Sequence, residues 1–432
     1  MKYLRQIRIR WWIFAFTFAF AMLSFIQRTS IAVAGESIIA ALHITQMQIG
    51  LLNAAFLTTY TLMQIPAGAL GERFGARRTY MAVGIVGLCA TLATPLLPIV
   101  FNGTAIFVAL LVTQGVLGVS QAPVFPMSAA VIEAWFPVNR WAIANGFQTS
   151  GMLLGGAVTP LLIVGLTQWV GWRGALLSIA LPVLLIFAAW GWYGRNSPEE
   201  HPSVSREELD ELPRRTVTAS PITGRRLAAI LTDRNVLLLS LSYLCMNYTF
   251  YLLTFWSFLY LVQVRHFSGI SSGIAGMVPW IGAAVGAAAG GILSDRAVER
   301  FGCRWGYQIV PLISLPMVAV LLLVTISVTT PWSAVLALAA AFASVEVNEG
   351  AYWAATMRVA RADTGAAAGV LNTGGNAGGI LCQPVVALLS AAGGWKAAFA
   401  TGAVLAVIAG VLWLLIDTDP VPESVMLPDG GP

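Results

Sequence analysis

Residues 68–78 read GALGERFGARR, and residues 290–304 read GGILSDRAVERFGCR. Each stretch follows a long apolar run and combines glycines, an acid and arginines. Glycine lets helices approach closely, and the charged groups can pair with each other or with helix ends. Two copies at corresponding places indicate two related halves of one fold. We expect a latch that closes one side of the molecule, with topology-setting charges as the alternative; its members are Gly68, Glu72, Arg73, Gly75, Arg77, Asp295 and Arg296.

The composition indicates a membrane protein. The 432 residues are 58% hydrophobic and 10% charged, with a mean hydropathy of +0.78. Soluble domains carry roughly 25% charged residues, so a soluble chain could not bury this much apolar surface. A soluble enzyme, a nucleic-acid-binding protein and a disordered chain are therefore excluded. The four cysteines show no Cys-X-X-Cys or histidine pairing, and we expect neither a metal site, a cofactor nor catalytic residues.

Twelve apolar stretches of about 20 residues or more predict an all-α membrane protein with twelve transmembrane helices. The short alternating segments that mark a membrane β-barrel are absent from the sequence. The helices are expected near residues 11–34, 48–70, 79–99, 104–135, 141–165, 174–194, 236–262, 270–293, 307–328, 332–357, 364–390 and 396–416.

The basic residues predict the orientation in the membrane. Lys and Arg are retained on the cytoplasmic side, and 20 of the 24 fall in segments on one side of the predicted spans, against three on the other. Both termini should therefore face the cytoplasm, with the first span retained rather than cleaved as a signal peptide. We expect the cytoplasmic membrane of a bacterium. The latch then lies on the cytoplasmic side, where Glu133 and Arg140 should form a further gate pair.

The polar segment 195–235 divides the chain into two sets of six predicted helices. We expect an N-terminal bundle over 1–194, a cytoplasmic linker over 195–235, a C-terminal bundle over 236–416 and a disordered tail over 417–432. The linker should contain a short amphipathic helix near residues 205–212.

The latch motif resembles the loop 2–3 motif of the major facilitator superfamily, with Glu72 where Asp is usual. Within that superfamily the chain is most similar to the anion:cation symporter branch, which includes hexuronate, glucarate and galactonate transporters. The similar stretches are QRTSIAVA at 27–34, YTLMQIP at 60–66, QAPVFP at 121–126, WFPVNR at 135–140 and GVLNTGGNAGG at 369–379. The resemblance implies two six-helix bundles related by a pseudo-two-fold axis, which rock around a substrate site between them.

The sequence also departs from this branch. Gln27 stands where Asp is usual, Gln114 where Arg is usual, and Gln121 where Glu is usual. Gly151 stands where bacterial members often have Gln. Amides can hydrogen-bond to a substrate but cannot carry a proton, so these changes bear on both substrate and coupling.

Arg28 is the one basic residue inside a predicted span. A guanidinium there costs roughly 2.5–3.5 kcal/mol on insertion scales, so it normally faces a cavity or a partner. Its planar fork suits a carboxylate, and the resemblance implies that it binds the anionic substrate. The alternative is a structural ion pair, or a side chain that reaches towards the headgroups.

Glu346 and Glu349 are the acids deep in a predicted span, and their spacing places them on one helix face. A carboxylate that takes up a proton in one conformation and releases it in another would couple transport to protons. The alternative is structural: a salt bridge to Arg28 or Arg358, or a hydrogen bond between helices. The other candidate substrate-binding residues are Gln27, Tyr60, Gln114, Gln121, Tyr251, Asn372 and Asn376; for the aromatic ones, packing is the alternative.

We therefore expect a secondary transporter, acting as a monomer, for a small organic anion such as a sugar acid, taken up with protons. A facilitator, exchanger or exporter of another metabolite is the first alternative, and a ligand sensor that does not transport is the second. The partners expected are the anionic substrate and the lipid bilayer, without nucleic acid.

Overall fold

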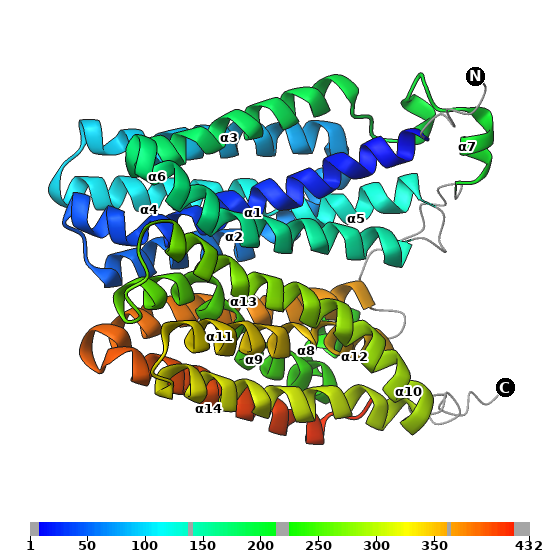
Figure 1. Cartoon of the computed structure of the whole chain (residues 1–432). Helices are drawn as coiled ribbons and strands as arrows, with labels where there is room; N and C mark the ends of the chain where they lie inside the picture. The colour runs from blue at the N-terminus through cyan, green and yellow to red at the C-terminus, as the bar shows by residue number, and fades with distance from the viewer. Residues whose placement is uncertain (1–7, 137–140, 213–223, 361–363, 419–432) are drawn as a thin grey trace, which may run out of the picture.

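The computed structural model describes residues 8–136, 141–212, 224–360 and 364–418, and the described chain is helical almost throughout (Figure 1). Apart from two short 3-10 turns, it consists of α1 (Ile9–Leu42), α2 (Gln46–Phe74), α3 (Ala76–Val100), α4 (Gly103–Gln121), α5 (Val124–Trp135), α6 (Trp141–Tyr193), α7 (Arg206–Asp210), α8 (Gly224–Thr232), α9 (Arg234–Gln263), α10 (Gly269–Ser327), α11 (Pro331–Glu346), α12 (Glu349–Ala360), α13 (Thr364–Ala392) and α14 (Gly394–Leu412).

The long helices α6 and α10 each contain two helices joined at one glycine. Gly171 interrupts α6 with φ 69° and ψ 170°, and Gly302 interrupts α10 with φ 77° and ψ 171°. Glycine adopts a positive φ without the steric cost that a side chain would bring. The two joints agree with the four separate helices expected over 141–194 and 270–328.

The predicted spans 104–135 and 332–357 each contain a short break, which divides the first into α4 and α5 and the second into α11 and α12. Pro123 precedes α5, and its ring removes one backbone donor between α4 and α5. Between α11 and α12, the side chain of Asn348 donates to the carbonyls of Ser344 and Val345 and accepts from Ser314. These side-chain bonds compete with the helical ladder and end α11 at Glu346.

The outer surface suits a lipid environment. Ten helical segments in the described part of the chain are long and apolar enough to cross a bilayer. Large apolar side chains point outwards, among them Leu62 and Ile99. Trp169, near the end of the first helix of α6, and Trp192, near the end of the second, are 88% and 79% exposed, as expected for anchors in the two interfacial regions. The protein is therefore an integral membrane protein.

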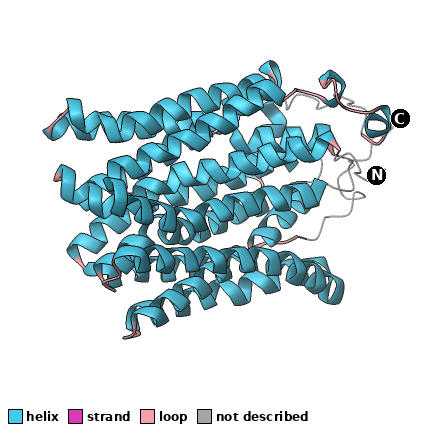
Figure 2. Cartoon of the chain, turned by 45° about the horizontal axis from the view of Figure 1, so that its top comes forward, coloured by secondary structure: helices cyan, strands magenta, loops and turns pink. Residues whose placement is uncertain are grey.

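The N-terminal helices, blue to green, lie in the upper part of Figure 1, and the C-terminal helices, green to red, lie in the lower part. The helices run roughly alongside one another in a second view as well (Figure 2).

Small residues allow close contact between helix backbones within each half. Gly282, Gly286 and Gly290 of α10 pack directly on the α11 backbone and the residue that follows it, where a Cβ atom would lie 2.1–2.3 Å from a carbonyl oxygen.

The described part of the linker contacts the N-terminal end of α1 through hydrogen bonds and ion pairs. Ser205 caps α7 by accepting a hydrogen bond from the Glu208 backbone, which confirms the short helix expected near 205–212. The buried Glu208 carboxylate accepts from the backbone of Ile9 and Arg10 and from Arg10 Nε at 3.0 Å. Glu211 accepts from Arg8 and from Arg10 Nη2. Of the expected tail over 417–432, residues 419–432 lie outside the described residues.

Candidate functional site

A cavity of about 790 Å³ lies between the two halves, with walls from α1, α2, α5, α6 and α9 to α13. Beyond it, at the end away from the termini, the halves touch: Gln46 Nε2 donates to Ser390 Oγ at 2.8 Å, and Gly273 packs against Leu161. The volume falls in the range of small-molecule sites.

Arg28 lies in the cavity wall without an acidic partner. Its side chain is 6% exposed, and its Nε and Nη2 atoms have no hydrogen-bond partner among the described residues. The guanidinium carbon lies 4.6 Å from the ring centres of Phe25 and Tyr60 and 5.0 Å from that of Phe56. The rings offset part of the desolvation cost, and the open donors can take an anionic group. The salt bridge to Arg28 considered from the sequence is not formed.

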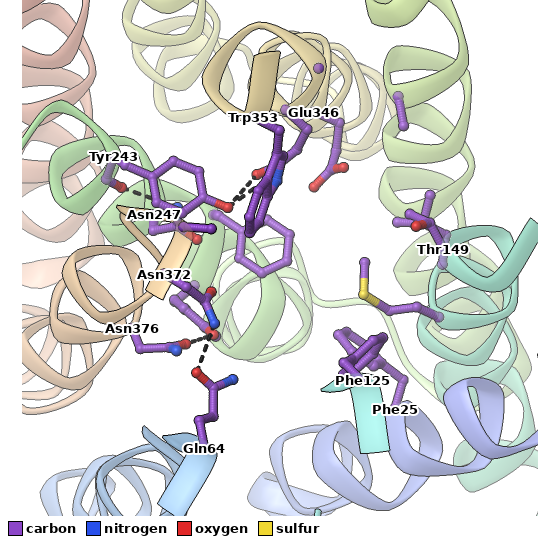
Figure 3. Close-up of a pocket in the computed structure, with 18 of the residues that line it drawn as sticks. Phe25, Gln64, Phe125, Thr149, Tyr243, Asn247, Glu346, Trp353, Asn372 and Asn376 are labelled. Atoms are coloured by element: carbon purple, nitrogen blue, oxygen red, sulfur yellow. Dashed lines mark hydrogen bonds between the residues drawn. The ribbon is translucent and has the colours of Figure 1, made fainter. Parts of the chain in front are cut away.

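Glu346 and Glu349 line the same cavity, one on each side of the interruption between α11 and α12. Glu349 accepts from the Tyr243 hydroxyl at 3.1 Å and from Trp353 Nε1 at 2.9 Å (Figure 3). The buried Glu346 side chain points into the cavity and makes no hydrogen bond to a described group.

Two asparagines of α13 complete the wall. Asn376 accepts from the Tyr251 hydroxyl at 2.9 Å, while its own Nδ2 atom is buried without a partner among the described residues. Asn372 donates to Gln64 Oε1 at 2.7 Å and so joins α13 to α2 across the cavity (Figure 3). Five of the candidate residues thus line one cavity: Arg28, Tyr60, Tyr251, Asn372 and Asn376.

The three predicted glutamines lie elsewhere. Gln27, Gln114 and Gln121 sit inside the N-terminal half and do not line the cavity. Gln27 donates to Thr91 at 2.7 Å and accepts from Gln121, which in turn accepts from Ser24. Their expected contact with substrate therefore has no support in this geometry. Gly151 contacts α1 so closely that a Cβ atom would lie 2.7 Å from a backbone oxygen, so no longer side chain fits there.

Among the described side chains, the predicted gate residues form no ion pair between the halves. Gly75 has φ 80° and joins α2 to α3, and Arg77 donates from its side chain to the Gly191 carbonyl of α6, within the same half. Arg73, Glu133 and Arg296 are exposed. Ion pairs between described side chains join only Arg8 and Arg10 to Glu208 and Glu211. Gly68 lies in α2; the side chains of Glu72 and Asp295, and all of Arg140, are outside the described part.

Several lining residues were not among the sequence candidates, notably Gln64, Tyr243 and Trp353. Helical spacing could have found them. Tyr243 lies four and eight positions before Asn247 and Tyr251, and Gln64 lies four positions after Tyr60. Such spacing places these polar side chains on one helix face.

The comparisons with known proteins agree with this architecture. The family model of the Major Facilitator Superfamily matches residues 16–381. The probable sulfoacetate transporter SauU of Cupriavidus necator is 27% identical over 374 residues, which cover 84% of this chain and 83% of that protein. The probable galactarate/D-glucarate transporter GudP of Escherichia coli is 24% identical over 429 residues, covering 96% and 95%. The hexuronate transporter of Bacillus subtilis is 24% identical over 401 residues, covering 92% of each.

The fold has a match among solved structures. A bacterial homolog of the human lysosomal transporter Spinster, in an inward-facing and unoccupied conformation, superposes with a TM-score of 0.75 at 19% identity and covers 94% of this chain and 96% of that chain. The matched relatives are transporters and not enzymes, as the sequence predicts. The helical architecture, the cavity between the halves and the family match over residues 16–381 lead to one conclusion: the chain belongs to the major facilitator superfamily.

Proposed function

We propose that the protein transports a small organic anion across a membrane by alternating access, with Arg28 as the group that binds the anion. The observation that carries this proposal is a buried guanidinium, facing a cavity between two halves, with two nitrogen atoms left without partners. A charge in that position is costly unless something neutralises it. The names of the relatives, which include sulfoacetate, galactarate/glucarate and hexuronate transporters, support an anionic ligand.

In this proposal twelve helices span the cytoplasmic membrane of a bacterium, with both termini and the linker in the cytoplasm. The glycine joints within α6 and α10 support the count, since each divides a helix too long for one crossing. The contact between halves lies at the end away from the termini. The cavity would then open to the cytoplasm, and a rocking motion would expose it to the other side.

Glu346 and Glu349 are the groups that we assign to proton coupling. Glu349 is held by two donors, Tyr243 and Trp353, which stabilise a carboxylate, whereas Glu346 has no described donor. A buried carboxylate without donors favours its protonated form. Glu346 is thus the better proton carrier, and Glu349 the better fixed charge.

A facilitator without coupling is the second candidate. It is supported by the hydrogen bonds of Gln27 and Gln121, which occupy the interior of the N-terminal half with groups that cannot carry protons. Uptake into proteoliposomes, with and without an inward-directed proton gradient, separates the two proposals.

The substrate for that assay is the anion that most raises the melting temperature of the purified protein. Accumulation driven by the gradient, and lost in Glu346→Gln while exchange persists, supports coupling through Glu346. Uptake that does not depend on the proton gradient supports the facilitator. Loss of all uptake in Arg28→Gln, but not in the control Arg173→Gln outside the cavity, supports the role of Arg28.

A further inference from the structure

The cavity carries opposite charges on opposite walls. Among the described side chains that line it, Arg28 is the one basic group, and Glu346 and Glu349 are the acids. Arg28 lies on α1 against Phe25, whereas the acids lie at the α11–α12 interruption. Figure 3 shows Phe25 and Glu346 on facing walls of the cavity. A ligand that fills the space therefore meets one cation at one side and two acids at the other.

The unpartnered atoms show where acceptor groups of a ligand fit. Arg28 Nε and Nη2 and Asn376 Nδ2 are buried donors without a described partner. A buried donor gains most from an acceptor oxygen, such as that of a carboxylate. The opposite wall suits a donor group of the ligand, because Glu346 offers acceptor oxygens and has no described hydrogen-bond donor. A hydroxyl or N–H group of the ligand fits there.

Aromatic side chains make up a large part of the cavity lining. They are Phe25, Tyr60, Phe125, Phe250, Tyr251 and Trp353. Aromatic walls suit a ligand with a flat or apolar body, because such a body costs little free energy to remove from water.

We propose that the substrate is a monocarboxylate with an aromatic or apolar body and a hydrogen-bond donor at its far end, and that dicarboxylates are disfavoured. This inference rests on the proposed function, because it takes Arg28 to bind the first carboxylate. A second carboxylate would then lie near Glu349, the fixed charge that Tyr243 and Trp353 hold, with no cation on that side among the described lining residues. Like charges brought together in this way cost several kcal/mol in general, whereas a donor would be satisfied.

Matched pairs of anions test the inference by equilibrium binding to the purified full-length protein. The pairs are 4-hydroxybenzoate against terephthalate and gluconate against glucarate, measured at about pH 7.5, where the ligand carboxyl groups are ionised. A carboxylate replaces the hydroxyl group of 4-hydroxybenzoate in the first pair and the terminal hydroxymethyl group of gluconate in the second. The member with one carboxylate should bind about tenfold more tightly or better, and 4-hydroxybenzoate should bind more tightly than gluconate. In the double variant Glu346→Gln/Glu349→Gln the difference in affinity within each pair should become smaller.

The outcomes separate this inference from the proposed function. Binding of terephthalate or glucarate as tight as that of its partner, and lost in Arg28→Gln, overturns the inference and leaves the proposed function in place. A difference in affinity within each pair that stays the same in the double variant overturns the proposal that Glu346 and Glu349 disfavour a second carboxylate. Binding of none of the four anions, or binding unchanged in a folded Arg28→Gln protein with an unaltered melting temperature, overturns both.

Discussion

Two arginines in the described chain are almost completely buried, and their surroundings differ. Arg10 is 3% exposed and donates to Glu208, whose side chain is equally buried. Arg28 is 6% exposed and has aromatic rings around it, but no acid. Removing one member of a buried ion pair destabilises a protein more than removing one member of an exposed pair, because the remaining buried charge has no compensating partner. Arg10 therefore has a structural role, whereas the open donors of Arg28 fit the anion-binding role proposed above.

The ring of Tyr60 should contribute to anion binding through Arg28. Tyr60→Leu removes a ring 4.6 Å from the guanidinium carbon, whereas Tyr60→Phe keeps it. A cation–π contact is worth roughly 0.5–2 kcal/mol, so the leucine variant should weaken binding about 2- to 30-fold. The phenylalanine variant should stay within about twofold. Titration of all three proteins with the same anion measures this, and equal affinities for Leu and Phe would exclude the ring contribution.

At the scale of elements, the fourth predicted span of each half is interrupted at a corresponding place. α4 ends at Gln121 before Pro123, and α11 ends at Glu346 before Asn348. Gln121 is bonded inside the N-terminal half, whereas Glu346 faces the cavity. The acid is thus retained in the second half at the place where the first half carries an amide.

The interruption at Asn348 was not predictable from local sequence. The apolar pattern continues across residues 332–357, so it reads as one span. The bond from Ser314, 34 residues earlier, fixes the Asn348 side chain, and such a partner becomes visible only in the folded chain. The joint at Gly171, by contrast, falls in the gap between the predicted spans 141–165 and 174–194.

The glycines of α10 should be intolerant of a side chain only where they face α11. In Gly286→Ala the added Cβ would lie 2.1 Å from the Ala343 oxygen, so the helices must move apart. Overpacking of this kind typically costs about 1–3 kcal/mol and should lower the melting temperature of the purified protein. Gly291→Ala is the control, because nothing lies within 4 Å of its Cβ position. Equal melting temperatures for the two variants would refute the close packing.

The contact of the linker with α1 should depend on Glu208. Glu208→Gln removes the buried acid of the pair and leaves Arg10 with the partly exposed Glu211 as its acidic partner, so it should destabilise the protein by roughly 3–5 kcal/mol, seen as a lower melting temperature. Glu211→Gln should have a smaller effect, because the Glu211 side chain is 43% exposed and Arg10 keeps its bond to Glu208. Comparable losses in both variants would contradict the importance of burial.

The contribution of Glu211 to the stability of the folded protein should also depend on pH. The hydrogen bond from Arg8, and then that from Arg10, holds the pKa of Glu211 below its usual range. A lowered pKa stabilises the native state above the unfolded pKa, and that stability is lost as pH falls through the folded value. The difference in melting temperature between the wild type and Glu211→Gln should therefore be present at neutral pH and shrink below about pH 4. A difference that grows on acidification would contradict this assignment.

At the scale of the whole molecule, the halves touch beyond the cavity at the end away from the termini. Thiol labelling tests the sidedness. In a variant without native cysteines, Ala288→Cys in the cavity should react with an impermeant reagent added on the side of the termini. Ser37→Cys lies in a smaller pocket formed by α1, α6, α9 and α10 and should react from the opposite side. Labelling of both from one side would contradict the proposed arrangement.

Much of the site could be predicted from sequence because membrane spans restrict charge. Arg28, Glu346 and Glu349 were identifiable since each is an ionisable residue in an apolar run, and all three line the cavity. Gln27 and Gln121 were assigned to substrate from resemblance, but neutral amides are satisfied equally well by neighbouring helices. These charged residues deep inside a predicted span all line the cavity, whereas the neutral amides divide: Asn372 and Asn376 line it, and Gln27 and Gln121 do not.

The dissociation constant of one monocarboxylate for the wild type and for Arg28→Gln tests the central claim most directly. Removing one member of a buried charge pair generally costs 2 kcal/mol or more, so the account predicts a loss of about 30-fold or greater. Arg173→Gln, with the same change outside the cavity, should bind like the wild type. An Arg28→Gln protein that melts like the wild type and binds the anion equally well would contradict the account.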